Sequence, residues 1–64
     1  MIIWPRQLVV INRLAATKGM REIQLIAMPS SVEITVTYDD GSYDRKLINI
    51  DGKEIQRNEI FGNE

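Results

Sequence analysis

Apolar and polar residues alternate without interruption along residues 32–38 of the chain. A period of two is typical of a β-strand with one buried face, because successive side chains of a strand point to opposite sides. An Asp-Gly pair follows at Asp40 and Gly41, and it suits a tight type I′ turn because both residue types tolerate positive φ angles. The pattern therefore predicts a β-hairpin whose second strand starts at Tyr43.

A two-residue turn also fixes the register of this hairpin. It places Tyr38 opposite Tyr43 and Ile34 opposite Leu47. Two further pairs follow in the same register, Thr37 with Asp44 and Thr35 with Lys46. All of these pairs are chemically compatible across strands, which favours this register.

A second Asp-Gly pair, Asp51 and Gly52, predicts a weaker hairpin in which Ile48 meets Ile55. Apolar side chains would then lie on both faces of the sheet. One face would carry Ile48, Ile50 and Ile55, and the other Ile34, Val36 and Leu47. A helix could cover one face and a second copy of the chain the other. Alternatively, the sheet could close into a small barrel.

Residues 21–28 predict another strand, with apolar side chains on both faces. Ile23, Leu25 and Ala27 share one face, and Ile26 and Met28 take the other. Residues 29–31 predict the turn to the next strand, because proline cannot donate a ladder hydrogen bond and serine side chains bond their own backbone.

Residues 5–18 are best interpreted as a helix. Pro5 suits the first helical position, Lys18 the negative end and Gly19 a left-handed cap. At about 100° per residue, one side of this helix is apolar, and it carries Leu8, Val10, Ile11, Leu14 and Ala15. The β-branched residues at 9–11 favour a strand instead. In that case residues 7–14 pair with residues 21–28 and the domain is all-β.

These elements predict a single small domain, residues 1–64, of the α+β class. Its N-terminal helix packs on an antiparallel meander of three or four strands, and an all-β small barrel is the alternative. The mostly polar tail, residues 57–64, is expected to fray, although Ile60 and Phe61 could dock on the domain.

Length and composition favour self-association. A chain of 64 residues supports one small core, and such a core seldom stabilises a fold by more than about 3–5 kcal/mol. With no cysteine and no histidine, neither a disulfide nor an ordinary zinc site can reinforce it. No apolar run approaches the length of a membrane span. The absence of a signal segment and of cysteine indicates a cytoplasmic protein.

Charge is unevenly distributed, although the net charge is only −1. Residues 1–32 hold four basic residues and one acidic residue, whereas residues 33–64 hold four basic and eight acidic residues. This asymmetry is compatible with head-to-tail contacts or with a charged partner. Solvated faces of small domains give similar counts.

The residues that carry most catalysis are missing. Nucleophiles and general bases are usually histidine, cysteine or a held pair of carboxylates, and only carboxylates are available. Asp39, Asp40 and Asp44 surround the predicted turn, where aspartate is common for structural reasons. A calcium loop starting at Asp40 fails because Arg45 stands where glycine is needed, and no phosphate-binding loop matches. We therefore expect no enzyme, no cofactor and no metal site.

The N-terminal segment, residues 1–4, is the strongest candidate for contact with another protein. Ile2, Ile3 and Trp4 are costly in water unless they are buried in the chain's own core or against a partner. We expect a non-enzymatic protein-binding or regulatory accessory module that forms a homo-oligomer. Small chains of this kind are frequent among phage and bacterial accessory proteins.

A small nucleic-acid-binding β domain is the alternative function. Its candidate contacts are the basic residues of the N-terminal half, Arg6, Arg13, Lys18 and Arg21. Exposed aromatic side chains, Trp4, Tyr38 or Tyr43, would offer stacking surfaces for bases. Four dispersed cations in an acidic chain displace few counterions from phosphates, so nucleic acid is the less favoured partner.

Overall fold

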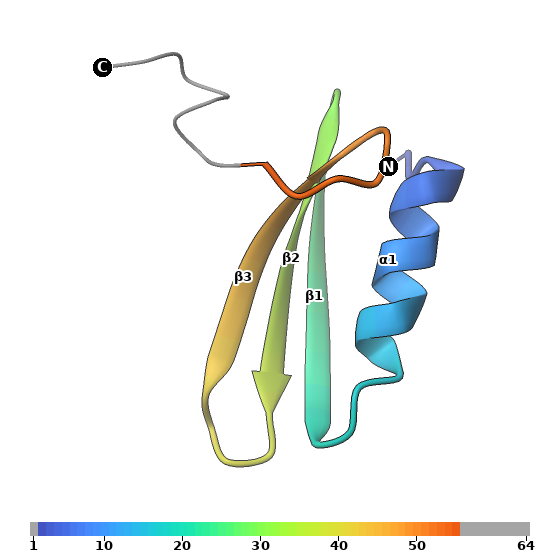
Figure 1. The fold of residues 1–64 in the computed structure, drawn as a ribbon. Coiled ribbons are helices and arrows are strands. Elements are labelled where there is room, and N and C mark those ends of the chain that lie inside the picture. Colours follow the sequence, from blue (N-terminus) through green and yellow to red (C-terminus); the bar gives the residue numbers. More distant parts are fainter. Residues whose placement is uncertain (1, 56–64) are drawn as a thin grey trace.

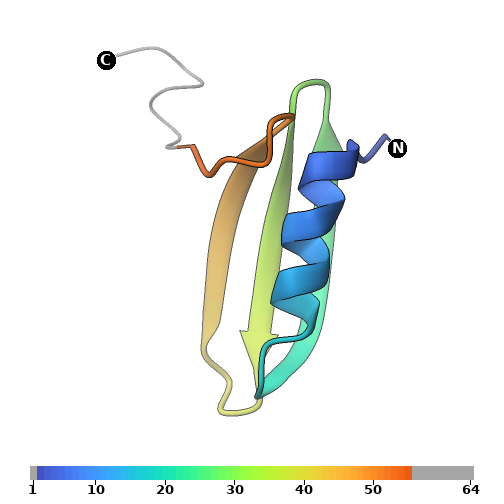
Figure 2. The ribbon, with the colours of Figure 1, turned by 45° about the vertical axis from the view of Figure 1, so that its right-hand side comes forward.

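A computed structural model describes residues 2–55 of the chain. The elements follow in the order α1 (Pro5–Ala15), β1 (Met20–Met28), β2 (Ser31–Tyr38) and β3 (Tyr43–Asn49). The strands form one open antiparallel sheet in the order β1-β2-β3, and α1 lies against one of its faces (Figures 1 and 2). The α+β prediction is confirmed. The all-β barrel is wrong, because residues 5–15 are helical and the sheet does not close.

The start of α1 follows the sequence signals closely. Pro5 occupies the first turn, where its missing N–H leaves no hydrogen bond unmade. Trp4 is the extended N-cap residue, and its N–H donates to Oε1 of Gln7 at 2.9 Å. This contact is the half of a capping box that a glutamine at the third helical position supplies.

The end of α1 comes three residues earlier than predicted, at Ala15. The N–H of Ala16 is shared between the carbonyls of Asn12 and Arg13 at 3.1 and 3.3 Å, and the N–H of Thr17 donates to Leu14 at 3.0 Å. Such bonds to the third preceding residue tighten and close a last helical turn. Gly19 is therefore not the helix cap. With φ +85° it lies in the turn that leads into β1.

The β1–β2 hairpin turns at Pro29 and Ser30, and Ser31 is already the first residue of β2. Leu25 pairs with Ile34 in the regular part of the ladder. The register shifts between Met20 and Glu22, which leaves one extra residue in β1 as in a β-bulge. Met20 consequently packs against the core.

The β2–β3 hairpin forms, but its register differs by one residue from the predicted one. Ile34 pairs with Lys46 instead of Leu47, and Thr37 pairs with Tyr43 instead of Asp44. The cause lies in the loop. The N–H of Gly41 donates to the Tyr38 carbonyl at 3.0 Å, and the N–H of Tyr38 donates to the Ser42 carbonyl at 2.8 Å.

Three residues, 39–41, therefore form the loop instead of two. Gly41 has φ +90°, and no residue other than glycine has a positive φ in the described part of the chain. A type I′ turn would require a positive φ at Asp40 as well. The geometry is that of a type I turn followed by a left-handed glycine, the usual three-residue hairpin loop.

This shift of one residue exchanges the two faces of β3. Ile48 pairs with Val32 and is buried in the core beneath α1, whereas Leu47 pairs with Glu33 on the other face. The prediction that Ile48 and Ile34 lie on opposite faces is therefore wrong. The polar residues Asp44 and Lys46 share the face that α1 covers in part.

The chain turns back once more at Gly52 by the same kind of loop. The N–H of Gly52 donates to the Asn49 carbonyl and the N–H of Asn49 to the Lys53 carbonyl, both at 2.9 Å. Gly52 has φ +84°. A single bridge follows and pairs Ile48 with Glu54, where Ile55 was predicted, and residues 2–55 contain no fourth strand. The predicted fraying of residues 57–64 lies outside the described residues.

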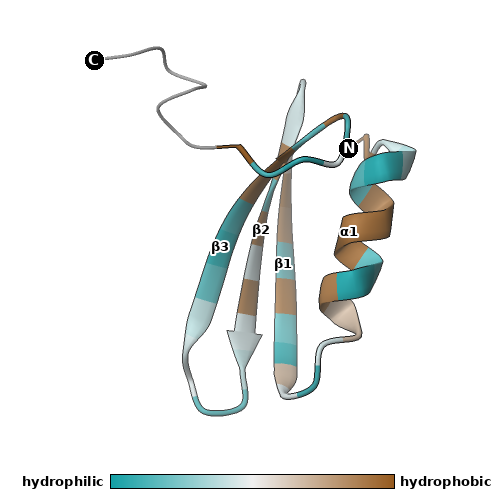
Figure 3. Ribbon diagram, viewed as in Figure 1, coloured by the Kyte–Doolittle hydropathy of each residue, from teal (hydrophilic) through white to brown (hydrophobic). Residues whose placement is uncertain are grey.

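The core lies between α1 and the sheet. Its centre is the middle strand β2, whose side chains Val32, Ile34 and Val36 are fully buried. Ile11 closes the core from the helix and Ile48 from β3. Figure 3 shows the alternating apolar bands along β1 and β2 that supply this packing.

Candidate functional site

The three N-terminal residues predicted to contact a partner, Ile2, Ile3 and Trp4, differ in burial. Ile3 is half-buried and packs against the core. Ile2 and Trp4 are 69% and 42% exposed. Ile3 therefore belongs to the chain's own core, whereas Ile2 and Trp4 lie on its surface.

A polar residue sets the rotation of α1 about its axis. Gln7 is 1% exposed, and its Nε2 donates to the carbonyl oxygen of Ile48 at 3.1 Å. Gln7 and Ile11 are the buried residues of the helix, and Leu8 lies about 100° further round. Leu8, predicted on the buried side, is therefore 47% exposed.

The Arg6 side of α1 lies against the loop that follows β3. A Cβ built on Gly52 would stand 2.9 Å from the Arg6 carbonyl oxygen, so a glycine is what lets the helix and the loop touch. Arg6 and Leu8 lie about 200° apart around the helix. The side that carries Leu8 consequently turns away from the loop after β3 and toward the β1 side of the sheet, while α1 itself packs against the middle strand β2 (Figure 2).

The outer edge of β1 has no partner strand within residues 2–55. β1 is nine residues long, and its stretch 23–28 contains no charge, proline or glycine. On the sheet face away from α1, Ile26 and Met28 are 58% and 38% exposed. Edge strands of monomeric proteins are normally shortened or blocked by charges or proline, and β1 has neither protection along this stretch.

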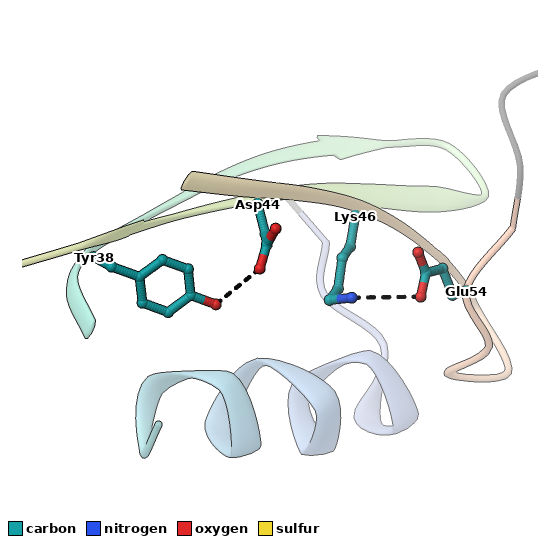
Figure 4. Close-up of polar contacts among 4 residues, drawn as sticks. All are labelled: Tyr38, Asp44, Lys46 and Glu54. Carbon is teal, nitrogen blue, oxygen red and sulfur yellow. Dashed lines mark hydrogen bonds and ion pairs between the residues drawn. The ribbon is translucent and has the colours of Figure 1, made fainter. Parts of the chain in front are cut away.

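The opposite edge, β3, is protected. The N–H of Ile55 donates to the Leu47 carbonyl at 2.8 Å, and the bridge between Ile48 and Glu54 covers the end of the strand. Lys46 forms an ion pair with Glu54 at 3.6 Å (Figure 4). The two edges of the sheet therefore differ in their capacity to receive another chain.

Two of the three carboxylates considered for catalysis, Asp40 and Asp44, form hydrogen bonds within the β2–β3 hairpin. Asp40 accepts hydrogen bonds from the Ser42 hydroxyl at 2.6 Å and from the Ser42 N–H at 2.9 Å, and these bonds lower the pKa of Asp40. Asp44 accepts a hydrogen bond from the Tyr38 hydroxyl at 3.0 Å (Figure 4), and this bond raises the pKa of Tyr38. An open hollow of about 350 Å³ lies between the Gly19 turn and the Asp40 loop, and the residues that line it include Lys18, Asp39 and Asp40.

No group of three or more histidine, cysteine, aspartate or glutamate side chains is placed to hold a metal ion within residues 2–55. Over the same residues, no helix combines the length and the apolar character needed to span a membrane.

The four basic residues of the nucleic-acid hypothesis are all exposed but spread over three elements. Arg6 and Arg13 lie on α1, Lys18 in the turn after it and Arg21 at the irregularity of β1. Tyr43 lies on the sheet face away from α1, where the guanidinium of Arg45 stands 5.9 Å from its ring. The structure thus puts the most exposed tyrosine and the helix arginines on opposite sides of the molecule.

No protein-family model, no curated protein and no solved structure matches this chain.

Proposed function

We propose that this protein is a non-enzymatic accessory module that binds protein and self-associates through the β1 side of its fold. The observation that carries the proposal is an unblocked edge strand with exposed apolar side chains on its open face, next to a helix that exposes a further apolar side chain. We assign to this β1-side surface Ile26 and Met28 of β1, Leu8 of α1, and Ile2 and Trp4, which precede α1, all of them exposed. Exposed apolar groups gathered around one element mark interaction sites, and tryptophan is enriched among the residues that dominate binding energy.

The small core gives a physical reason for association. Six hydrophobic residues are buried in the described part of the chain, and neither disulfide nor histidine ligand is present to reinforce them. Binding that occurs only in the folded state stabilises that state by mass action. The lack of cysteine supports a cytoplasmic location.

The proposal is tested by light scattering over a wide range of protein concentration. The wild-type protein is expected to exceed the 7.4 kDa mass of one chain. Trp4→Ser removes the ring while serine is a good N-cap, and Leu8→Gln retains helix propensity. Both variants are expected to weaken association at least tenfold.

Val9→Gln is the matched control, because Val9 is also an exposed apolar residue of α1 but lies about 100° beyond Leu8, further from the buried side. It is expected to leave association unchanged. A wild-type protein that stays monomeric at all concentrations would overturn the proposal. So would an equal loss of association in the Val9 and Leu8 variants.

A further inference from the structure

We infer that the partner of the β1-side surface is a second copy of this chain, bound by antiparallel pairing of the two β1 strands about a two-fold axis. The inference rests on the proposed function and adds which strands meet at the seam between the two copies, namely the two β1 strands, and in which register they pair. Two open three-stranded sheets become one six-stranded sheet, with both helices on the same face. The unpaired backbone N–H and C=O groups of the two β1 edges then form hydrogen bonds with each other.

The irregularity near Arg21 determines where the axis falls. It ends the regular ladder, so the regular part of β1 consists of residues 22–28, and the centre of that part is Leu25. Pairing about Leu25 places Gln24 opposite the second copy's Ile26, and Ile23 opposite the second copy's Ala27. Each pair joins side chains that point to the same face, as a continuous sheet requires.

The charges of β1 are compatible with this register. Its charged residues are Arg21 and Glu22, both near its start. Pairing about Leu25 puts Glu22 opposite Met28, so the two Glu22 side chains stand six residues apart, or about 20 Å. This separation exceeds the screening length of about 8–10 Å at moderate salt. A register centred on Glu22 would bring like charges together and is disfavoured.

The protected edge of β3 argues against the other arrangement that the charge asymmetry allows. A head-to-tail contact would pair β1 of one copy with β3 of the next and would continue into a filament. Residues 53–55 already bond to the end of β3, and Asp44, Arg45 and Lys46 place charges along the rest of it. A symmetric contact through β1 uses only the unblocked edge and closes as a dimer.

The β1-side surface supplies the apolar side chains of the proposed dimer interface. Side chains of the β1-side surface are between 38% and 69% exposed. Two copies contribute ten such side chains and the paired backbone of both β1 strands toward the lower limit of about 1,200 Å² for a specific interface. The helix residues of this surface extend the contact above the sheet, and Ile26 and Met28 extend it below.

Cross-linking of single-cysteine variants tests the seam, since the chain has no cysteine of its own. Gln24→Cys and Ile26→Cys protein are mixed and treated with a short thiol cross-linker. Both positions are exposed on the open face, so the fold tolerates the changes. The mixed dimer is expected to exceed either homodimer at least fivefold. Thr35→Cys, on the same face but in the middle strand, is the control and is expected to stay uncross-linked.

Other distributions of products contradict the inference. Predominance of either homodimer would place the axis elsewhere and overturn the Leu25 register. If light scattering shows a dimer while none of the β1 cysteines cross-links above the Thr35→Cys control, β1 pairing is wrong and the proposed function stands. Amide exchange in the unmodified protein is the second measurement. Alternate β1 amides are expected to lose protection on dilution, and concentration-independent exchange throughout β1 would also overturn the seam.

Discussion

The Gln7 carboxamide joins the first turn of α1 to the end of β3, because its Nε2 donates to the Ile48 carbonyl oxygen and its Oε1 accepts the Trp4 N–H. Both ends of one buried side chain are thus bonded. Among the described residues, no buried side-chain nitrogen or oxygen lacks a partner. Gln7 therefore sets the rotation of α1 and, with it, which helix residues face the β1 edge.

Gln7→Met is expected to lower the free energy of unfolding by about 2–3 kcal/mol. Methionine fills a similar volume but leaves the Ile48 carbonyl and the Trp4 N–H without their partner. Chemical denaturation at one fixed protein concentration measures the loss. Arg13→Met, at an exposed polar residue of α1 outside the β1-side surface, is the control and is expected to change stability by no more than about 0.5 kcal/mol. Equal losses would show that the buried hydrogen bonds contribute nothing.

The types of the elements could be predicted because each is encoded locally. The alternation along residues 32–38 indicates a strand whatever its neighbours are. Pro5 and the apolar spacing of residues 8–15 outweigh the β-branched run at 9–11, since the strand preference of such residues depends on context. The order of the strands follows from short connections, which make consecutive strands neighbours.

The register of β3 could not be read from the Asp-Gly pair alone. The same two residues fit a two-residue loop and a three-residue loop, and the two choices differ by one residue. The side chain of Asp40, bonded to Ser42 two residues later, favours the second choice, because such an Asx turn holds Asp40 at negative φ. The serine at position 42 was the available signal.

The rotation of α1 about its axis also could not be predicted from the hydropathy pattern, for a related reason. Gln7 falls within the buried arc beside Ile11, but a polar side chain is normally buried only where it can form a hydrogen bond. That partner, the Ile48 carbonyl, is 41 residues away in sequence. Exposure of Leu8 follows from the burial of Gln7, so the candidate surface became visible only in the folded chain.

The two hairpin glycines are expected to differ in their tolerance of alanine. Gly41→Ala meets nothing within 4 Å and suffers mainly from its positive φ, a loss of about 1 kcal/mol. Gly52→Ala has the same strain and also sets its Cβ 2.9 Å from the Arg6 carbonyl oxygen. It is expected to lose about 1–2 kcal/mol more, as overpacked sites do. Thermal denaturation of the two variants compares them, and equal losses would mean that the loop does not press on α1.

Stability is expected to fall on acidification in part through Asp40. Its pKa is lowered by the hydrogen bond from the Ser42 hydroxyl and then by that from the Ser42 N–H. A carboxyl whose pKa is lower in the folded protein stabilises the fold above its unfolded pKa of about 4, and this contribution is lost as the pH falls through the folded pKa. Ser42→Ala removes the first bond. An NMR titration is expected to show the pKa of Asp40 rising toward its ordinary value, and Ser30→Ala is expected to leave it in place.

The alkaline titration of Tyr38 tests the β2–β3 register in solution. The hydrogen bond to Asp44 is the largest cause of the raised pKa of Tyr38, followed by burial and by the Asp44 charge. A group whose pKa is raised by folding stabilises the fold fully below its unfolded pKa of about 10, and this contribution is lost as the pH rises through the folded pKa. Asp44→Ala is expected to return the pKa of Tyr38 toward its ordinary value, whereas Asp51→Ala leaves it raised. In the register predicted from a two-residue turn, Asp44 would lie opposite Thr37 on the other face and could not accept this bond. If the pKa of Tyr38 stays the same in Asp44→Ala, the result would therefore contradict the pairing of Val36 with Asp44.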